Sequence, residues 1–296
     1  MINILCSPID ELEMLKLKEA GCNMVLLSDE FHGTRMPAFF SMNKLDMMID
    51  NAKKWDLKVV IAMNRIYMEE DLNSIDPYLE YLVKKDVDYI YYNDPCIYIH
   101  ALKYDITDRL IYNPDTLCSN SFDINFMLHK GIYGCVIAKE LTLQQMCEIA
   151  GKTNNSMVII HGYLNMSYSK RLLLDSYLDM INKDIDLKHN YHLKLKEATR
   201  NDYMPVYEDD KGTCIYTPYV QESFEELNIL IDSGVNNFIV ERSFVDIDMI
   251  CDAIRAYRDI ESGKDAKLIK EAFYQKYDNY PLSSGYMYQK TTLVKV

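Results

Sequence analysis

Polar and ionisable side chains follow six short apolar runs of the sequence, at the points where buried strands are expected to end. These residues are Asn64, Asn93-Asp94, Asn113, Lys139-Glu140, His161-Gly162 and Glu241-Arg242. Two carboxylates, an imidazole and an amine brought to one place could carry out general acid–base chemistry. The alternative is that these groups cap helices and pair with one another.

The candidate residues divide into two groups. The catalytic candidates are Asp94, Glu140, His161 and Glu241, and the substrate-binding candidates are Asn64, Asn113, Lys139, Arg171 and Arg242. No metal ligands are assigned. The nearest metal-like spacing, His189-Asn-Tyr-His192, lies in a polar stretch between lysines and is better explained by a solvated helix face.

Eight apolar runs predict the strands that must position these side chains. They cover residues 2–5, 24–27, 58–63, 88–92, 109–112, 133–138, 157–160 and 237–240. Runs that are apolar throughout are typical of strands buried on both faces, as in a parallel sheet. Helical patterns lie between them, at residues 7–20, 43–55, 76–85, 121–130, 142–151 and 246–262. The alternation predicts an α/β fold, a (β/α)8 barrel of the TIM type, in which strand ends converge on one mouth.

One long gap interrupts the alternation of strands and helices. Residues 1–262 are expected to form the barrel, with an insertion at 163–235 between strands seven and eight. The insertion contains a predicted helix at 167–181, a charged stretch, a strand-like piece at 213–216 and a helix at 224–233. The tail, residues 263–296, is expected to pack across the barrel.

The charge balance excludes some classes of partner. The 296 residues carry a net charge of −13, so the chain is not a generic nucleic-acid or membrane binder. Residues 183–200 are a candidate basic patch, although a solvated helix face explains this stretch better. The basic residues of this stretch are Lys188, His189, His192, Lys194, Lys196 and Arg200, and its acidic residues are Asp184, Asp186 and Glu197. Neither a signal peptide nor a membrane-length apolar stretch is present, so we expect a cytoplasmic protein without membrane contact.

The eight cysteines give no recognisable motif. No two lie within four residues of each other, which removes C-x-x-C redox motifs and ordinary zinc knuckles. Most sit in apolar stretches, as expected for small buried side chains in a reducing compartment. Dinucleotide, P-loop, zinc-protease and serine-hydrolase motifs are also absent from the sequence.

Several segments, in order, resemble the collagenase-like peptidase U-32 family. Val158-Ile-Ile-His-Gly162 is followed by Ser167-Tyr-Ser-Lys-Arg171, and Ala138-Lys-Glu-Leu-Thr142 resembles the family's A-R-E-L-S-L segment. Tyr203 to Thr213 resembles its P-I-E-D-E-x-G-T segment, and residues 230–258 resemble its L-I-D-A-G … E-G-R … A-Y-R end. The resemblance covers most of the chain.

The resemblance implies chemistry that the family's peptidase label does not describe. Members of the family take part in hydroxylating RNA bases or ubiquinone without O2, and many hold a [4Fe-4S] cluster on four cysteines of the strand-seven insertion. The positions of the first two ligands correspond here to Asn165 and Leu172, and no cysteine lies between Cys147 and Cys214. Such a cluster needs thiolate ligands, so we expect this chain to bind no cluster, and no other cofactor, by itself.

A short, cysteine-poor branch of the family resembles this chain in length and tail. That branch occurs beside a longer, cluster-bearing paralogue and is implicated in forming 5-hydroxyuridine at the tRNA wobble position, with prephenate metabolism as the apparent hydroxyl source. The resemblance therefore implies a tRNA hydroxylation component, with the paralogue as partner and tRNA as substrate. The alternatives are a collagenase-like peptidase and a non-catalytic barrel subunit. We expect the interface with the paralogue to use the segment between Gly162 and Gly212.

Overall fold

Eight parallel strands close into a barrel in the computed structural model, which describes residues 1–187, 190–196, 198 and 201–289. The first six strands are β1 (Asn3–Cys6), β2 (Met24–Leu27), β3 (Lys58–Met63), β4 (Tyr89–Tyr92), β5 (Leu110–Tyr112) and β6 (Gly134–Val136). The last two are β7 (Ser156–Ser169) and β11 (Asn237–Val240). Each strand pairs in parallel with the next, and β11 closes the ring against both β7 and β1. The predicted TIM-like barrel is therefore confirmed.

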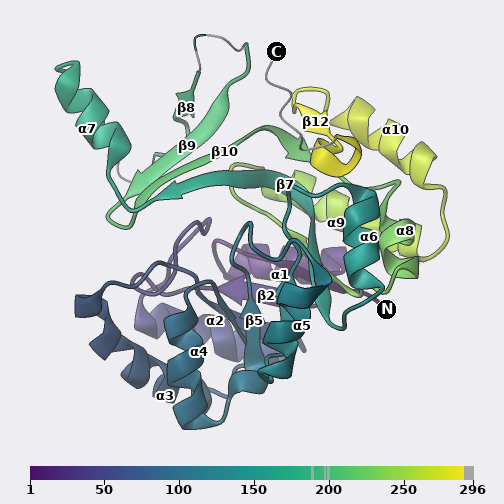
Figure 1. Ribbon diagram of the computed structural model, residues 1–296. Helices are drawn as coiled ribbons and strands as arrows, with labels where there is room; N and C mark the ends of the chain where they lie inside the picture. Colours follow the sequence, from purple (N-terminus) through teal and green to yellow (C-terminus); the bar gives the residue numbers. More distant parts are fainter. Residues whose placement is uncertain (188–189, 197, 199–200, 290–296) are drawn as a thin grey trace.

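Helices surround this barrel on the outside (Figure 1). They are α1 (Glu11–Ala20), α2 (Met42–Lys54), α3 (Ile75–Lys84), α4 (Pro95–Ala101), α5 (Ser121–His129), α6 (Leu143–Ala150), α8 (Leu227–Asp232) and α9 (Ile247–Glu261). Short 3-10 turns precede α3 (Glu69–Ser74) and lie between α4 and β5 (Leu102–Tyr104 and Thr107–Arg109). No helix among the described residues is long and apolar enough to cross a membrane.

Two apolar cores explain why the strands are hydrophobic throughout. Alternate side chains such as Leu5, Val60 and Ile159 point inward and form a cluster inside the barrel. Their neighbours, such as Ile4 and Ile61, point outward into a larger cluster beneath the helices. Because both faces of every strand are covered, the polar residues available for chemistry are confined to the strand ends and loops.

Local capping sets the helix boundaries. The predicted helix at 142–151 begins with a capping box, in which the Thr142 hydroxyl accepts from the backbone N–H of Gln145 at 3.3 Å and the Gln145 side chain accepts from the Thr142 N–H at 3.0 Å. The predicted helix at 7–20 begins later, at Glu11, because the Asp10 side chain accepts from the N–H of Glu13 at 2.8 Å and caps it there. Its end at Gly21, in the left-handed conformation with φ 108°, is as predicted.

The insertion forms an arm that projects beyond the barrel (Figure 1), which we define as residues 163–221. β7 runs on out of the barrel and pairs with β10 (Gly212–Gln221), which pairs in turn with β9 (Met204–Asp209), and β9 pairs with β8 (Lys194–Leu195). The predicted helix at 167–181 is shortened to α7 (Leu173–Met180), because residues 167–169 are held as strand against β10. The predicted strand-like piece at 213–216 lies within β10.

The described part of the tail packs on the barrel side of the arm. It comprises α10 (Ala266–Lys276), β12 (Leu282–Ser283) and a 3-10 turn (Gly285–Tyr288). Leu282 pairs with Val220 of β10, and Phe273 of α10 is buried in the outer core. Of the predicted basic patch, Lys188, His189, Glu197 and Arg200 lie outside the described residues, whereas His192, Lys194 and Lys196 are exposed on or beside β8 rather than on a helix.

Candidate active site

Polar side chains from several strand ends and loops line a pocket at the mouth of the barrel. They are Arg35, Asn64, Asn113, Asp115, Lys139, Asn165 and Glu241. The floor of the pocket is apolar and includes Leu26, Tyr91 and Ile159, which belong to the core inside the barrel. The mouth therefore combines an apolar floor with charged and amide side chains around a cavity of about 30 Å³, which has room for one or two groups the size of a water molecule.

Asp115 is the centre of the ionic contacts in this pocket. It pairs with the guanidinium of Arg35 and, at 2.9 Å, with the ammonium of Lys139. The Asn113 side-chain oxygen accepts from the Asp115 N–H at 3.1 Å and fixes the loop after β5. Burial alone would raise the pKa of Asp115, but the two cations outweigh it and lower the pKa to about 2. Asp115 is therefore a permanent anion that holds both cations in place.

Arg35 reaches the mouth from the long loop after β2. Its backbone is left-handed, with φ 59°, and the N–H of the preceding Thr34 donates to the Asn64 side-chain oxygen at 2.9 Å. The guanidinium donates to the Asn64 carbonyl at 3.2 Å and lies 3.5 Å from the Asn165 side-chain oxygen. These contacts tie the loop to the ends of β3 and β7 and aim a buried cation into the pocket.

Glu241 differs from Asp115 in its protonation. Burial raises the pKa of Glu241 to about 7, and the opposing charges of Lys139 and Arg35 only partly offset this. Within the described part of the chain, no side chain or backbone group is hydrogen-bonded to its carboxyl group. The mouth thus holds two carboxyl groups with pKa values far apart, about 2 for Asp115 and about 7 for Glu241. In enzymes such a pair can divide the roles of fixed charge and proton transfer.

The structure brings together four of the nine predicted site residues. Asn64, Asn113, Lys139 and Glu241 line the mouth, whereas Asp94, Glu140, His161, Arg171 and Arg242 do not. We expected His161, Glu140 and Glu241 to share one pocket, with Asp94 and Asn113 on its wall. The placement of His161, Glu140 and Asp94 is wrong, whereas Glu241 and Asn113 do line the mouth. Asp94 caps a helix and Arg242 forms an ion pair, so the alternative of capping and pairing holds for these two residues.

His161 faces the helices because the strand register shifts by one residue. Ile159 lies opposite Ile239, yet His161 lies opposite the next residue, Val240, so β7 carries one extra residue at this point. Such a bulge turns the following side chains to the other face of the strand. The imidazole is fully buried among Phe224, Tyr257 and Phe273 instead of pointing into the mouth.

The hydrogen bonds around His161 determine its tautomer. The Tyr257 hydroxyl donates its proton to the Ile160 carbonyl at 2.8 Å and accepts from the Ser223 N–H at 3.0 Å. The His161 Nδ1, 3.3 Å from that hydroxyl, must then be the protonated nitrogen. Burial lowers the pKa of His161 to about 3, so the ring is neutral at physiological pH.

This neutral histidine predicts acid sensitivity. The pKa of His161 is about 3 in the folded state against 6.5 ordinarily, so the unfolded chain binds the proton first. The free energy of unfolding should therefore fall as the pH decreases from about 6.5 towards 3, by about 1 kcal/mol per pH unit. Urea unfolding at a series of pH values should give a flatter profile for His161→Leu than for wild type. The same change at the exposed His129 is the control, and parallel profiles for wild type and His161→Leu would contradict the assignment.

The other predicted residues outside the mouth have local contacts or none. Asp94 caps α4, accepting from the N–H of Cys96 at 3.0 Å and of Tyr67 at 3.1 Å. Arg242 pairs with Glu13 of α1 at 2.7 Å and joins the loop after β11 to the first helix. Glu140 lies near Tyr219 of β10, whose pKa its charge helps to raise, and Arg171 is exposed at the outer end of the arm.

Comparisons with known proteins show the family of this chain. Residues 11–293 match the model of the family described as Peptidase family U32. The chain belongs to peptidase family U32. It is 24% identical over 302 residues to tRNA hydroxylation protein P2 of Bacillus subtilis (strain 168), covering 97% of this chain and 98% of that protein. It is 20% identical to tRNA hydroxylation protein P1 of the same organism, covering 86% of this chain and 62% of that protein.

A solved structure shares the fold. The U32 peptidase Mk0906 is 14% identical to this chain, with a TM-score of 0.52 over 83% of this chain and 94% of that one. At this identity the likeness extends to the fold alone, and the site described above depends on the residues of this chain.

The arm of this U32 chain does not offer the ligands that the family's cluster requires. Asn165, at the first ligand position, faces the mouth, and its amide donates to the Ser167 carbonyl at 3.0 Å. Leu172, at the second position, is an apolar residue at the start of α7. Cys214 is buried on β10 and burial raises its thiol pKa to about 12. Within the described ranges, no group of three or more His, Cys, Asp or Glu could hold a metal ion.

Three polar residues of the mouth, Arg35, Asp115 and Asn165, were not predicted to be site residues. The prediction took the residues directly after each strand, whereas Arg35 lies eight positions beyond the end of β2 and Asp115 three beyond the end of β5. Asp115 could have been predicted, because Asn113-Pro-Asp115 is a polar turn directly after a buried strand. Nothing in the sequence around Arg35 distinguishes it from other loop cations.

Proposed function

We propose that this U32 chain is a component of tRNA wobble-uridine hydroxylation, forming 5-hydroxyuridine together with a longer, cluster-bearing paralogue. The observation that carries the proposal is the end-to-end match with tRNA hydroxylation protein P2, which leaves no large domain unmatched in either chain. The weaker match to tRNA hydroxylation protein P1, which is longer than this chain, supports a pairing of two related subunits.

The barrel mouth is the proposed reaction site. Arg35 and Lys139 would stabilise negative charge on a bound group, and Asn64 and Asn113 would position it. Glu241, whose pKa of about 7 lets it both accept and donate a proton near neutrality, would serve as the acid–base group. Hydroxylation also removes two electrons from the base, for which amino-acid side chains are poorly suited. We therefore assign electron transfer to the paralogue or to a diffusible molecule.

A peptidase activity receives no support from the described thiols. Burial raises the pKa of Cys6, Cys22, Cys96, Cys214 and Cys251. The pKa of Cys135 is raised by its hydrogen bond with Cys118 and by burial. A cysteine nucleophile needs the opposite, a pKa lowered by nearby positive charge. Cys214 is the nearest to such a setting, because Arg35 lowers its pKa, but burial outweighs that charge.

The chain purified alone under anaerobic conditions should contain no stoichiometric iron or sulfide. The reason is the donor set of the arm, in which an amide and an aliphatic side chain occupy ligand positions that require thiolates. Iron and sulfide assays on this chain and, as the control, on the paralogue purified in parallel provide the measurement. A broad absorbance near about 400 nm with matching iron content would contradict the prediction.

Nucleoside mass spectrometry of tRNA tests the proposed function. A strain lacking this chain should lose 5-hydroxyuridine, and a plasmid copy of the chain should restore it. Pull-down of the tagged chain at near-physiological salt should recover the paralogue. If the deletion leaves 5-hydroxyuridine unchanged, the proposed function fails. If the chain restores 5-hydroxyuridine in an extract lacking every paralogue, the proposed pairing fails.

A further inference from the structure

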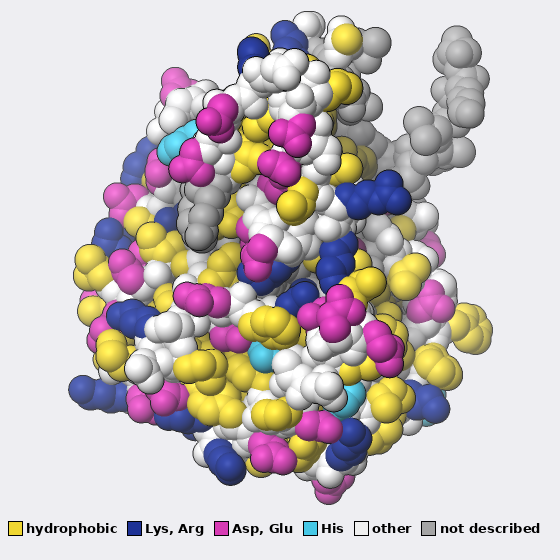
Figure 2. Space-filling view, turned by 90° about the vertical axis from the view of Figure 1, so that its left-hand side faces the viewer, with side chains coloured by type: hydrophobic (Ala, Val, Ile, Leu, Met, Phe, Trp, Pro, Cys, Tyr) yellow, Lys and Arg dark blue, Asp and Glu magenta, His cyan; other side chains and the backbone are white. Residues whose placement is uncertain are grey.

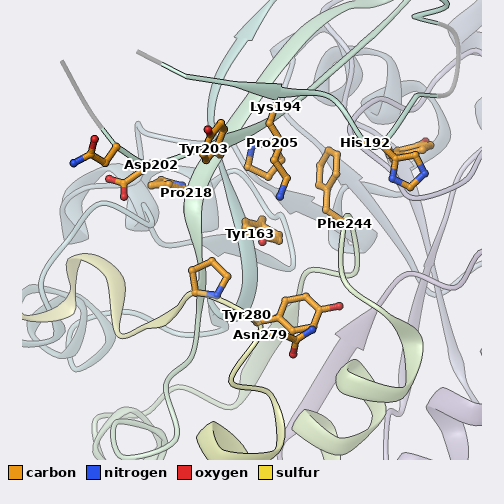
Figure 3. Close-up of a pocket in the computed structure, with 13 residues that line it drawn as sticks. Tyr163, His192, Lys194, Asp202, Tyr203, Pro205, Pro218, Phe244, Asn279 and Tyr280 are labelled. Carbon is orange, nitrogen blue, oxygen red and sulfur yellow. The ribbon is translucent and has the colours of Figure 1, made fainter. Parts of the chain in front are cut away.

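A groove separate from the mouth lies between the arm and the barrel. Its cavity volume is about 650 Å³, and its lining comes from the turn before β8, from β8 and β9, from β7, and from the loops after β11 and α10. Figure 3 shows its aromatic residues around one space, with Tyr163 at the centre, Tyr203 above, Phe244 to one side and Tyr280 below. We call this feature the arm groove.

Phe244 lies between the arm groove and the mouth. Its backbone is left-handed, with φ 66°, a conformation that a bulky residue seldom adopts and that costs about 1 kcal/mol or more. The conformation places the ring 4.8 Å from that of Tyr216 and 5.7 Å from that of Tyr191, between centroids. Tyr216 lines the mouth, so the two cavities are separated by a wall of two packed rings.

The described residues of the arm groove are less acidic than the chain as a whole. Lys194 and His192 line it, and the Lys196 ammonium lies 5.1 Å over the centre of the Tyr203 ring. Asp202 is the only acidic residue among the described residues of the lining. Figure 2, a view of the arm and barrel from one side, shows acidic, basic and hydrophobic side chains mixed across that face. The arm groove therefore differs from the acidic average of the chain.

We propose that the arm groove binds unpaired nucleotides of an RNA strand by stacking their bases on its aromatic side chains. Every base has a face that can stack on Tyr or Phe. A duplex keeps its bases covered and is held by a broader array of cations than the described lining of the arm groove offers. A strand lying in the arm groove would pass next to the mouth. The inference rests on the proposed function, for which it names the part of tRNA that is bound: the unpaired loop bases beside the target uridine.

Tyr203→Ala is the sharpest test, because the Tyr203 side chain is 55% exposed and its removal does not touch the core. Fluorescence anisotropy with a short fluorescein-labelled single-stranded RNA, using the full chain alone and mixed with the paralogue, measures the affinity. We expect about tenfold weaker binding for Tyr203→Ala, near wild-type binding for Tyr203→Phe, and weaker binding of the matching duplex. Lys194→Gln should reduce the slope of log affinity against log salt by about 1.

The matched control is Tyr177→Ala on α7, where the tyrosine is 54% exposed but lies on another part of the arm. It should bind the RNA as wild type does. Equal affinity of Tyr203→Ala and wild type, or no measurable RNA binding by the wild-type chain in either form, overturns the proposal. Unchanged RNA affinity with lost pull-down of the paralogue also overturns it and makes the arm groove a protein-docking surface.

Measurement of 5-hydroxyuridine separates this inference from the proposed function. If wild type restores the nucleoside while Tyr203→Ala binds RNA normally, the arm groove inference fails and the function stands. If Tyr203→Ala loses RNA affinity but wild type does not restore the nucleoside, the arm groove stands and the function fails.

Discussion

Replacing Glu241 with glutamine should reduce 5-hydroxyuridine formation by about 100-fold or more, the usual contribution of a positioned acid–base group. The amide keeps the size of the side chain and its place in the mouth but cannot exchange a proton. Because burial raises the pKa of Glu241 to about 7, wild-type activity should also change with pH near neutrality, and this limb should be missing from the variant. The fraction of 5-hydroxyuridine in tRNA from a complemented deletion strain measures the loss.

Stability provides an independent readout of Glu241. The pKa of Glu241 is about 7 in the folded chain, whereas its ordinary value is 4.5. The contribution of the Glu241 carboxyl group to the free energy of unfolding is therefore complete below about pH 4.5 and is lost as the pH rises through 7. Glu241→Gln should therefore be more stable than wild type at pH 8, by about 1–3 kcal/mol. Glu140→Gln, the same change at a strand end outside the mouth, should affect neither quantity. If Glu241→Gln retains full activity, Glu241 is not the acid–base group.

Replacing Asp115 with alanine should lower the free energy of unfolding by about 3–5 kcal/mol, since it leaves two buried cations without their shared partner. Arg35 and Lys139 are 7% and 5% exposed at their side chains, so water cannot replace the lost carboxylate at low cost. Urea denaturation of the purified chain measures the effect. Loss of 5-hydroxyuridine should accompany it, because the mouth would no longer hold its cations in place.

Two further variants show whether the buried charge is responsible. Asp259→Ala removes an exposed carboxylate paired with Lys264 at 2.9 Å and should cost less than about 1 kcal/mol. Adding Lys139→Met to Asp115→Ala should recover part of the lost stability, because one of the unpaired cations is then removed. A cost for Asp115→Ala no larger than that for Asp259→Ala would show that the mouth is well solvated.

The barrel could be predicted from the sequence because its strands are apolar on both faces and its helices carry ordinary caps. Runs such as 58–63 have no other stable environment than a covered parallel strand, and Thr142 with Gln145 marks a helix start unambiguously. The same reasoning placed Asn64, Asn113, Lys139 and Glu241 at strand ends, where the structure has them lining one mouth.

What could not be predicted depends on single-residue geometry and on long loops. The bulge that turns His161 away is one extra residue in β7, and the sequence around it is as apolar as that of a regular strand. Arg35 comes to the mouth through a left-handed backbone in the loop after β2, which residue types alone do not indicate. In the arm, pairing with β10 kept residues 167–169 extended against their helical pattern.

The closure of the barrel by β11 has a consequence for how the chain is made. The Asn3 side chain donates to that of Asn237 at 2.8 Å, across 234 positions of sequence. The ribosome must therefore synthesise the whole arm before β1 can pair with β11 on the edge that faces away from β2. Until then the growing chain exposes an apolar strand edge, the kind of surface that associates with other chains. Folding that waits for so distant a contact is slow, so this protein should depend on chaperones during synthesis more than its size alone suggests.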